Sequence, residues 1–198
     1  IGAGGHSRSS INLLKNRFPD IQMTILDDSY QDNINEYIHD IKLSGSLMSL
    51  KSDTSVFLSI GDNILRGKYF SLFNDLILKE NLFHNSAIIE NNCLFGVANQ
   101  IYANTYINSY CVIGDNNIIN TSSVVEHEVQ LGSHNYISIG AKIAGRVVIG
   151  NNCYIGANAI ILENITICDD VKLGAGCVVT KNISKAGTYA GIPARNIT

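Results

Sequence analysis

The second half of the chain carries a hydrophobic repeat with a period of six residues. A large apolar residue occupies every sixth position from Ile89 to Val179, through sixteen hexads without an insertion. The position four residues further along, from Cys93 to Ile183, is mostly small or β-branched. A period of six fits neither an α-helix nor an alternating strand. It predicts a parallel β-helix in which the short strands of successive coils stack on one another.

Glycine and cysteine occupy fixed places in this repeat. Six glycines directly follow the leading apolar residue, which suits a tight bend between short strands: Gly96, Gly114, Gly132, Gly150, Gly156 and Gly174. Four of the five cysteines occupy the small inward position, where cysteine acts as a compact hydrophobe: Cys93, Cys111, Cys153 and Cys177. We therefore expect these cysteines to be structural and reduced, as in the cytoplasm.

Residues 1–86 lack the repeat and alternate between strand and helix signals. The expected elements are a glycine-rich turn at 2–8, a helix ending near Pro19, strands at 21–26 and 56–60, and a second helix marked by Leu65, Phe70, Phe73 and Ile77. This order predicts a small Rossmann-like α/β unit. We expect its first strand to lie just before Ile1.

The glycine-rich turn is a candidate phosphate-binding loop. Glycines after a strand let backbone amides approach a phosphate, and the N-terminus of the following helix favours its charge. His6 or Arg8 could meet a diphosphate, and Asp27 and Asp28 at a strand end could accept hydrogen bonds from a ribose or a base. The loop lacks the full G-x-G-x-x-G spacing, which argues against an intact NAD site. A tight connection with solvated side chains is the alternative interpretation.

Composition narrows the class of protein. Hydrophobic residues make up 45% and charged residues 16%, which excludes intrinsic disorder. The net charge of −3 gives no electrostatic case for binding nucleic acid or an anionic membrane. No apolar run approaches the ~20 residues that span a bilayer, and no signal peptide is recognisable. We therefore expect a cytoplasmic globular protein without membrane insertion.

One hexad departs from the otherwise Asn-, Ser- and Thr-rich outer surface of the repeat. It contains Glu126, His127 and Glu128. A carboxylate can fix the imidazole tautomer, so His127 is a candidate general base. Gly145 follows eighteen residues later, one coil away if three hexads make a coil, and its N–H could face an oxygen held against His127. That arrangement suits acyl transfer; a surface histidine and a glycine that merely packs are the alternatives.

The segments 120–128 and 139–145 resemble the bacterial sugar O- and N-acetyltransferases of the NeuD and PglD type, which are hexapeptide-repeat acyltransferases. The similarity extends to the Gly-Gly-His loop, to Leu26-Asp27-Asp28, to 59–63 with Arg66, and to 189–195. It implies a left-handed β-helix with three hexads per coil. It also implies acetyl-CoA as co-substrate and a homotrimer with active sites between subunits. The implied domains are a Rossmann-like nucleotide-sugar-binding domain (1–86), a β-helix acetyltransferase domain (87–184) and a segment that closes over coenzyme A (185–198).

The same resemblance implies individual roles. His127 would be the base and Glu128 would orient it. The nucleotide sugar, with UDP the expected nucleotide, would be bound by Gly4, Gly5, His6, Asp27 and Asp28, and Asn120 would line the acceptor pocket. Coenzyme A would lie along Ser138, Gly145, Gly156 and Ala175. Tyr136 stands where the family often has a second histidine, so it would supply a hydroxyl at the thioester or the contact would be lost.

Three alternatives stay open at this stage. O-acetylation of sialic acid needs the same catalytic base but leaves the first domain without a nucleotide to bind. A zinc-dependent lyase would need three histidine ligands, and the hexads contain only His127 and His134, so we expect no metal. A non-catalytic β-helix would leave the Glu-His-Glu hexad without a purpose.

Overall fold

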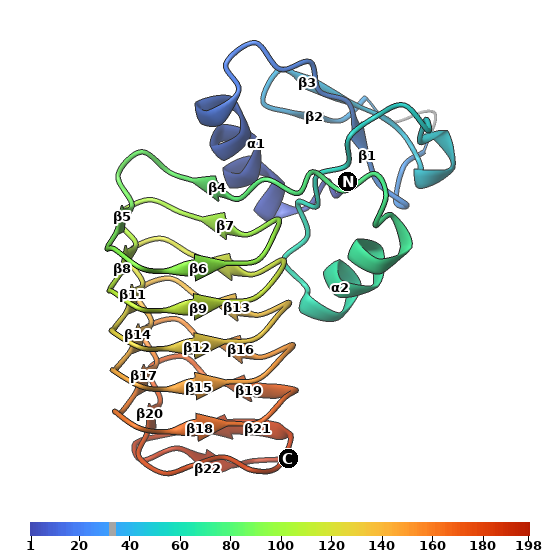
Figure 1. Ribbon diagram of the computed structural model, residues 1–198. Helices are drawn as coiled ribbons and strands as arrows, with labels where there is room; N and C mark the ends of the chain where they lie inside the picture. The colour runs from blue at the N-terminus through green and yellow to red at the C-terminus, as the bar shows by residue number, and fades with distance from the viewer. Residues whose placement is uncertain (32–34) are drawn as a thin grey trace. The chain divides into compact units, whose positions relative to one another are not determined.

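The computed structural model describes residues 1–31 and 35–198, which form two compact units, Ile1–Lys79 and Glu80–Thr198 (Figure 1). The first unit is an α/β region and the second is a parallel β-solenoid built from hexads. The solenoid ladder begins before residue 87, the expected start of the β-helix domain. Its first strand, β4 (Leu82–Phe83), already pairs with β7 (Gln100–Ile101).

The first unit is organised around a short sheet. Its elements are α1 (Gly5–Arg17), β1 (Ile25–Leu26), β2 (Tyr37–Ile38), β3 (Ile41–Gly45), the 3₁₀ helix η1 (Leu47–Ser49) and α2 (Asn63–Leu72). Strand β1 is parallel to β3, and β2 is antiparallel to β3. The start of the chain lies between β1 and the segment 57–59: the Gly2 N–H donates to the Leu26 carbonyl (2.9 Å) and the Ser59 N–H to the Ile1 carbonyl (2.8 Å).

Several predicted elements of this unit are shorter than expected. Only Ile25–Leu26 of the 21–26 segment forms a ladder, and in 56–60 only Val56 makes a bridge, to Ile77. The second helix ends at Leu72, so it does not reach Ile77. The reason is a turn in which the N–H groups of Leu76 and Ile77 both donate to the Phe73 carbonyl, which redirects the chain into the bridge with Val56.

The second unit has three faces, and each face is a sheet of parallel strands. Face 1 contains β4, β7, β10 (Ile118–Ile119), β13 (Tyr136–Ile137), β16 (Tyr154–Ile155), β19 (Val171–Leu173), β21 (Gly187–Ala190) and β22 (Arg195–Asn196), with only β22 antiparallel to its neighbour. Face 2 contains β5 (Ile88–Ile89), β8 (Tyr106–Ile107), β11 (Val124–Val125), β14 (Lys142–Ile143), β17 (Ile160–Ile161) and β20 (Val178–Val179). Face 3 contains β6 (Leu94–Phe95), β9 (Val112–Ile113), β12 (Gln130–Leu131), β15 (Val148–Ile149) and β18 (Thr166–Ile167).

The register confirms that three hexads make one coil. Ile119 pairs with Ile101 on one side and with Ile137 on the other, eighteen residues away in each direction. The leading apolar residue is the inward residue of each strand, and these three isoleucines are fully buried. We call the turns from face 1 to face 2 corner 1–2, and the turns from face 2 to face 3 corner 2–3.

The glycines that follow the leading residue have a different role from the one expected. A Cβ on Gly114 would lie 2.8 Å from the Gly132 carbonyl carbon, and one on Gly156 would lie 2.5 Å from the Leu173 carbonyl oxygen. These glycines therefore allow neighbouring coils to approach closely. The bend itself is made two residues later, where φ is positive, as at Asn116 (54°) and Asn152 (57°). Asparagine tolerates this region better than most residues.

The inward cysteines behave as the sequence predicts. Cys111, Cys153 and Cys177 are buried in the solenoid core, and Cys93 packs against it. Burial raises the pKa of the Cys111 and Cys153 thiols to about 12. Because only the thiolate is an effective nucleophile, these two thiols are unreactive at neutral pH.

A ladder of buried asparagines runs through the same inward positions. The backbone N–H and Nδ2 of Asn117 donate to Asn99 Oδ1 (2.9 and 3.0 Å), and the Asn135 N–H donates to Asn117 Oδ1 (2.8 Å). All three side chains are fully buried. Each amide thus pairs backbone groups of the adjacent coil that would otherwise be unsatisfied in the core.

Asn117→Ala is expected to destabilise the solenoid by about 2–3 kcal/mol, because it leaves the buried Asn135 N–H without an acceptor and removes one of the two donors to Asn99 Oδ1. Urea unfolding followed by circular dichroism would measure the change. The matched control is Asn164→Gly, at an exposed turn with φ of 60°, which should change the free energy of unfolding by less than about 0.5 kcal/mol. Equal unfolding midpoints for Asn117→Ala and the wild type would show that the ladder is dispensable.

Candidate active site

The first unit contains a pocket of about 440 Å³ that brings together all five residues predicted to bind a nucleotide: Gly4, Gly5, His6, Asp27 and Asp28. Gly4 is the N-cap of α1, and no atom lies within 4 Å of the place where a Cβ would stand on Gly4 or Gly5. The N-terminus of a thirteen-residue helix therefore meets open space beside the pocket. Such a position favours a phosphate, which accepts hydrogen bonds from backbone amides.

The two aspartates of this pocket have different environments. Asp27 Oδ2 accepts from the Ala3 N–H (2.7 Å), while Oδ1 accepts from the N–H and the hydroxyl of Ser29 (2.9 and 2.6 Å). Burial by itself would raise the pKa of Asp27, but the donors from Ser29 and Ala3 outweigh burial and hold the pKa below its ordinary value. Asp27 thus stays ionised and fastens the glycine loop to the end of β1.

Asp28 is paired with a residue that sequence reasoning missed. The Tyr69 hydroxyl donates to Asp28 Oδ2 (2.7 Å), which raises the pKa of Tyr69 to about 12. Tyr69 lies on α2 and lines the same pocket. At helical spacing from Leu65 and Phe73, an aromatic residue is typical of a core face, so the sequence held no signal for this role.

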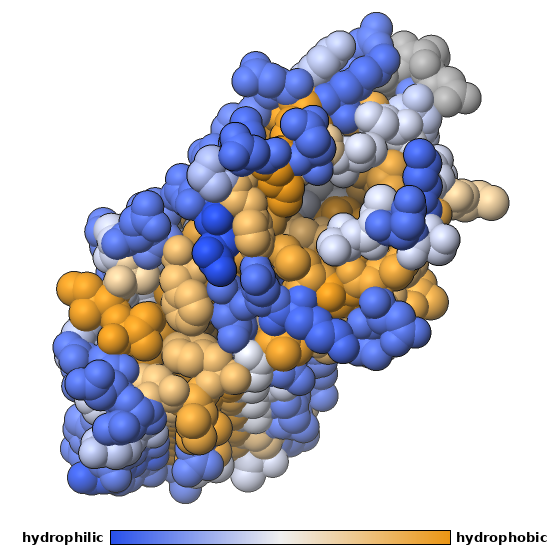
Figure 2. Space-filling model, turned by 45° about the horizontal axis from the view of Figure 1, so that its top comes forward, coloured by the Kyte–Doolittle hydropathy of each residue, from blue (hydrophilic) through white to orange (hydrophobic). Residues whose placement is uncertain are grey.

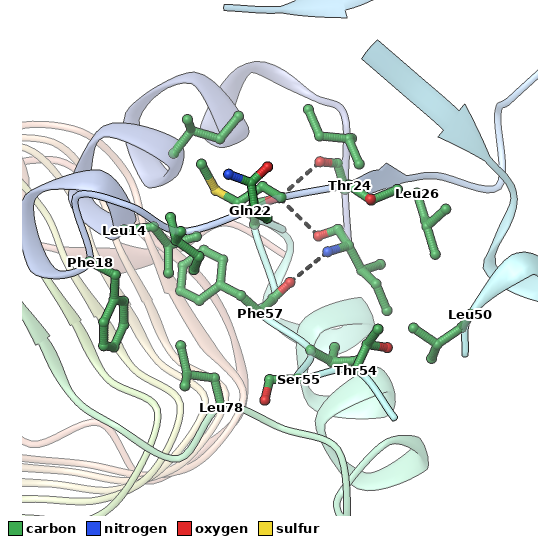
Figure 3. Close-up of a pocket in the computed structure, with 18 of the residues that line it drawn as sticks. Leu14, Phe18, Gln22, Thr24, Leu26, Leu50, Thr54, Ser55, Phe57 and Leu78 are labelled. Carbon is green, nitrogen blue, oxygen red and sulfur yellow. Dashed lines mark hydrogen bonds between the residues drawn. The ribbon is translucent and has the colours of Figure 1, made fainter. Parts of the chain in front are cut away.

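A larger pocket of about 850 Å³ adjoins the first and shares Ile1, Gly2 and Ser59 with it (Figure 3). Leu14, Phe18, Phe57 and Leu78 line one side, and Leu50 lies on the other. None of the five predicted nucleotide-binding residues is part of its wall.

In the solenoid, His127 and Gly145 meet at corner 2–3, as their spacing of eighteen residues predicts. A Cβ on Gly145 would lie 2.5 Å from His127 Cε1 and 2.7 Å from Nε2. The imidazole therefore lies directly against the Gly145 backbone, and only glycine leaves room for it there. The His127 side chain is 40% exposed in the single chain, so Nε2 is open to a small reactant.

The hydrogen bonds around His127 define its tautomer. His127 Nδ1 lies 3.0 Å from Glu128 Oε2. A carboxylate accepts but does not donate, so Nδ1 carries the proton and Nε2 of the neutral ring has the free lone pair. The Glu126 carboxylate makes a different hydrogen bond: its Oε2 accepts from Asn108 Nδ2 (2.7 Å). Of the two glutamates in this hexad, Glu128 is therefore the one in contact with the imidazole.

The Gly145 amide is a donor without an acceptor within the described part of the chain. The backbone N–H groups of the residues before and after Gly145 both make hydrogen bonds: the Ala144 N–H donates to the Ile161 carbonyl (3.0 Å) and the Arg146 N–H donates to the His127 carbonyl (2.9 Å). The N–H of Gly145 itself makes no hydrogen bond to any described residue. An imidazole in contact with a carboxylate and an unoccupied backbone donor therefore lie side by side, an arrangement suited to acyl transfer.

The other predicted solenoid residues gather at corner 1–2. Asn120, Ser138 and Gly156 are related by eighteen-residue steps in one column, and Ala175 lies at the same corner. Asn120 Nδ2 donates to the Tyr136 hydroxyl (2.7 Å), and the Tyr136 ring stacks on Tyr154 with centroids 5.4 Å apart. Within one chain, however, this group is separated from His127 by the width of face 2.

Three further observations concern metal binding and membrane spanning. In residues 1–31 and 35–198, no group of three or more His, Cys, Asp or Glu side chains is close enough to hold a metal ion. His134 lies in a turn, where its Nδ1 is 2.9 Å from Asn116 Nδ2. Over the same described residues, no helix is long and apolar enough to cross a membrane.

Both units contain a region that matches a known protein-family model. Residues 1–73 match the PglD N-terminal domain, and residues 128–163 and 146–181 match the bacterial transferase hexapeptide (six repeats). The fold and these repeats define a hexapeptide-repeat transferase. The chain therefore joins a region that matches the PglD N-terminal domain to repeats that match the hexapeptide transferases. No curated protein sequence gives a significant match.

Solved structures agree over the whole chain. One is a perosamine N-acetyltransferase from Caulobacter crescentus, a variant with one histidine replaced that was crystallised with CoA and GDP-perosamine. It is 27% identical with a TM-score of 0.91, and the match covers 100% of this chain and 95% of that one. The acetyltransferase domain of PglB from Neisseria gonorrhoeae, in complex with acetyl coenzyme A, is 28% identical with a TM-score of 0.88, covering 100% of this chain and 97% of that one. WeeI from Acinetobacter baumannii, at 24% identity and a TM-score of 0.90, shares the fold over 99% of this chain and 97% of its own.

Proposed function

We propose that the protein transfers the acetyl group of acetyl-CoA to the amino group of a nucleotide-linked amino sugar. The observation that carries this proposal is the contact between His127, oriented by Glu128, and Gly145, whose amide is an unoccupied donor. The likeness to structures solved with CoA, acetyl-CoA and GDP-perosamine supports the choice of both substrates.

The geometry suggests how each group acts. As the amine nitrogen attacks the thioester carbonyl, His127 Nε2 accepts the proton that the amine must lose, and Glu128 stabilises the imidazolium that forms. The carbonyl oxygen becomes negative when the N–C bond forms, and the Gly145 N–H is placed to donate to it. The C–S bond then breaks, and the coenzyme A thiolate takes up the proton from His127.

We further propose that the active site lies between subunits of a homotrimer. Asn120 at corner 1–2 and Tyr136 beside it on face 1 cannot reach His127 at corner 2–3 of the same solenoid, but a neighbouring solenoid could bring one corner of each together. Exposed apolar side chains at and beside corner 2–3 support a subunit contact there: Leu94 and Tyr110 are 66% and 62% exposed. Figure 2 shows apolar side chains gathered in patches on the molecular surface.

In this proposal the first unit binds the nucleotide. The amides and side chain of Gly4, Gly5 and His6 would hold the diphosphate at the N-terminus of α1, and Asp28 would accept hydrogen bonds from the nucleoside. The pocket residues do not distinguish UDP, the expected nucleotide, from the GDP bound by the similar Caulobacter enzyme. Because acetyl-CoA is an intracellular metabolite, we place the reaction in the cytoplasm.

The test is release of the coenzyme A thiol from acetyl-CoA in the presence of candidate acceptors. The panel comprises UDP-, GDP- and dTDP-linked 4-amino-4,6-dideoxy sugars, the same amino sugars without a nucleotide, and sialic acid. We expect turnover with a nucleotide-linked amino sugar and little with its free sugar. Turnover with sialic acid alone would replace N-acetylation by O-acetylation, and absence of turnover with every acceptor would contradict the proposal.

A further inference from the structure

Arg146 contacts the same carboxylate oxygen that orients His127. Its Nε lies 3.1 Å from Glu128 Oε2, and His127 Nδ1 lies 3.0 Å from that oxygen. Arg146 follows Glu128 by eighteen residues, so it occupies the equivalent position on the next coil. The imidazole and the guanidinium therefore share one acceptor.

The guanidinium is itself held from the other side. Arg146 Nη1 lies 3.0 Å from Glu163 Oε1, so two carboxylates on different coils bind one arginine. The planar fork of arginine can satisfy both at once, which the point charge of lysine cannot do as well. The backbone adds a further restraint, since the Arg146 N–H donates to the His127 carbonyl (2.9 Å).

The orientation of Glu128 needs such support. Its side chain is 49% exposed, so a single hydrogen bond to a histidine would leave several rotamers accessible. The backbone at Glu128 has a φ of 60°, and at Arg146 a φ of 58°. These turn conformations point both residues out at the same corner of adjacent coils.

We infer that Arg146 is a positioning residue for the catalytic base: it fixes Glu128 against His127. This inference rests on the proposed function. The other groups around the imidazole are Glu126, which Asn108 binds, and on the preceding coil Ser109 and Tyr110. Glu163 partly offsets the charge of Arg146, so the net effect on His127 is smaller than that of an isolated cation.

The test compares Arg146→Gln and Arg146→Lys with the wild type in steady-state kinetics. We expect Arg146→Gln to lower kcat about fivefold to tenfold with KM for both substrates within about twofold, because positioning affects the transition state more than binding. Arg146→Lys should recover part of kcat. Lys181→Gln, which removes an exposed cation two coils beyond Gly145, is the control and should match the wild type.

A second measurement does not depend on turnover. NMR observation of the His127 Nδ1–H proton, assigned with His127→Ala, should show this proton exchanging faster with solvent in Arg146→Gln than in the wild type, because Glu128 is no longer held against the ring. An unchanged Nδ1–H signal overturns the inference whether or not acetyl transfer is observed. An active wild type with unchanged kcat in Arg146→Gln also overturns it and leaves the proposed function standing.

Discussion

Replacing His127 with alanine should lower kcat for acetyl transfer at least a hundredfold. General base catalysis by a positioned histidine contributes about 10²–10⁴-fold. In this protein the His127 imidazole lies against the Gly145 backbone, and the N–H of Gly145 makes no hydrogen bond to any described residue. The acetyl-CoA and the nucleotide sugar should still bind, because the proposed pockets use other residues, so KM should change far less than kcat. Thiol release under saturating substrate measures the first effect, and calorimetric titration with coenzyme A measures the second.

His134→Ala is the matched control. This histidine lies on the coil after Asn116, with its Nδ1 2.9 Å from Asn116 Nδ2, and it has no part in the proposed site. We expect its turnover to stay within about twofold of the wild type. If the two variants lose activity equally, the loss reflects damage to the solenoid, and if neither loses activity, His127 is not the base.

The solenoid could be predicted well because its six-residue repeat directly gives the length of one coil, eighteen residues, and so the residues that stack on one another. The spacing of eighteen residues predicts that Gly145 lies against His127, and the register confirms it. The first unit was less predictable because its short strands do not recur at a fixed spacing and its helix α2 ends in an irregular turn. Strands of two to five residues without such a repeat leave little periodicity in the sequence.

Side-chain partners were the part of the site that the sequence could not supply. The residue types at Asp27 and Asp28 are identical, yet one fastens the loop through Ala3 and Ser29 while the other pairs with Tyr69. Arg146 gave no sign of its role, because its link to Glu128 depends on turn geometry and rotamers. The separation of Asn120 from His127 likewise follows from which corner each occupies, a property of the coil and not of residue type.

Gly145→Ala should also lower kcat about a hundredfold, although alanine adds a single methyl group. The added Cβ would stand 2.5 Å from His127 Cε1, well inside van der Waals contact, so the imidazole must move away. A displacement of about 1 Å in a reacting group can cost about 10²-fold in rate. The fold should tolerate the change: the clash falls on a half-exposed side chain, and alanine restricts the unfolded chain more than glycine does. Thermal unfolding should therefore match the wild type within a few degrees.

A double-mutant cycle separates this mechanism from a general disturbance of the corner. If Gly145→Ala acts by displacing the imidazole, it should cost almost nothing once His127 is already alanine, so the rates of His127→Ala and of the double variant should agree within about threefold. A further hundredfold loss in the double variant would mean that the methyl group acts on something other than the histidine. The most direct explanation would then be the backbone N–H of residue 145, because a Cβ at this position also narrows the approach of the thioester oxygen to that N–H. Imidazole added in solution distinguishes the two cases, since it should restore some turnover to His127→Ala but less to the double variant if the oxygen cannot reach the donor.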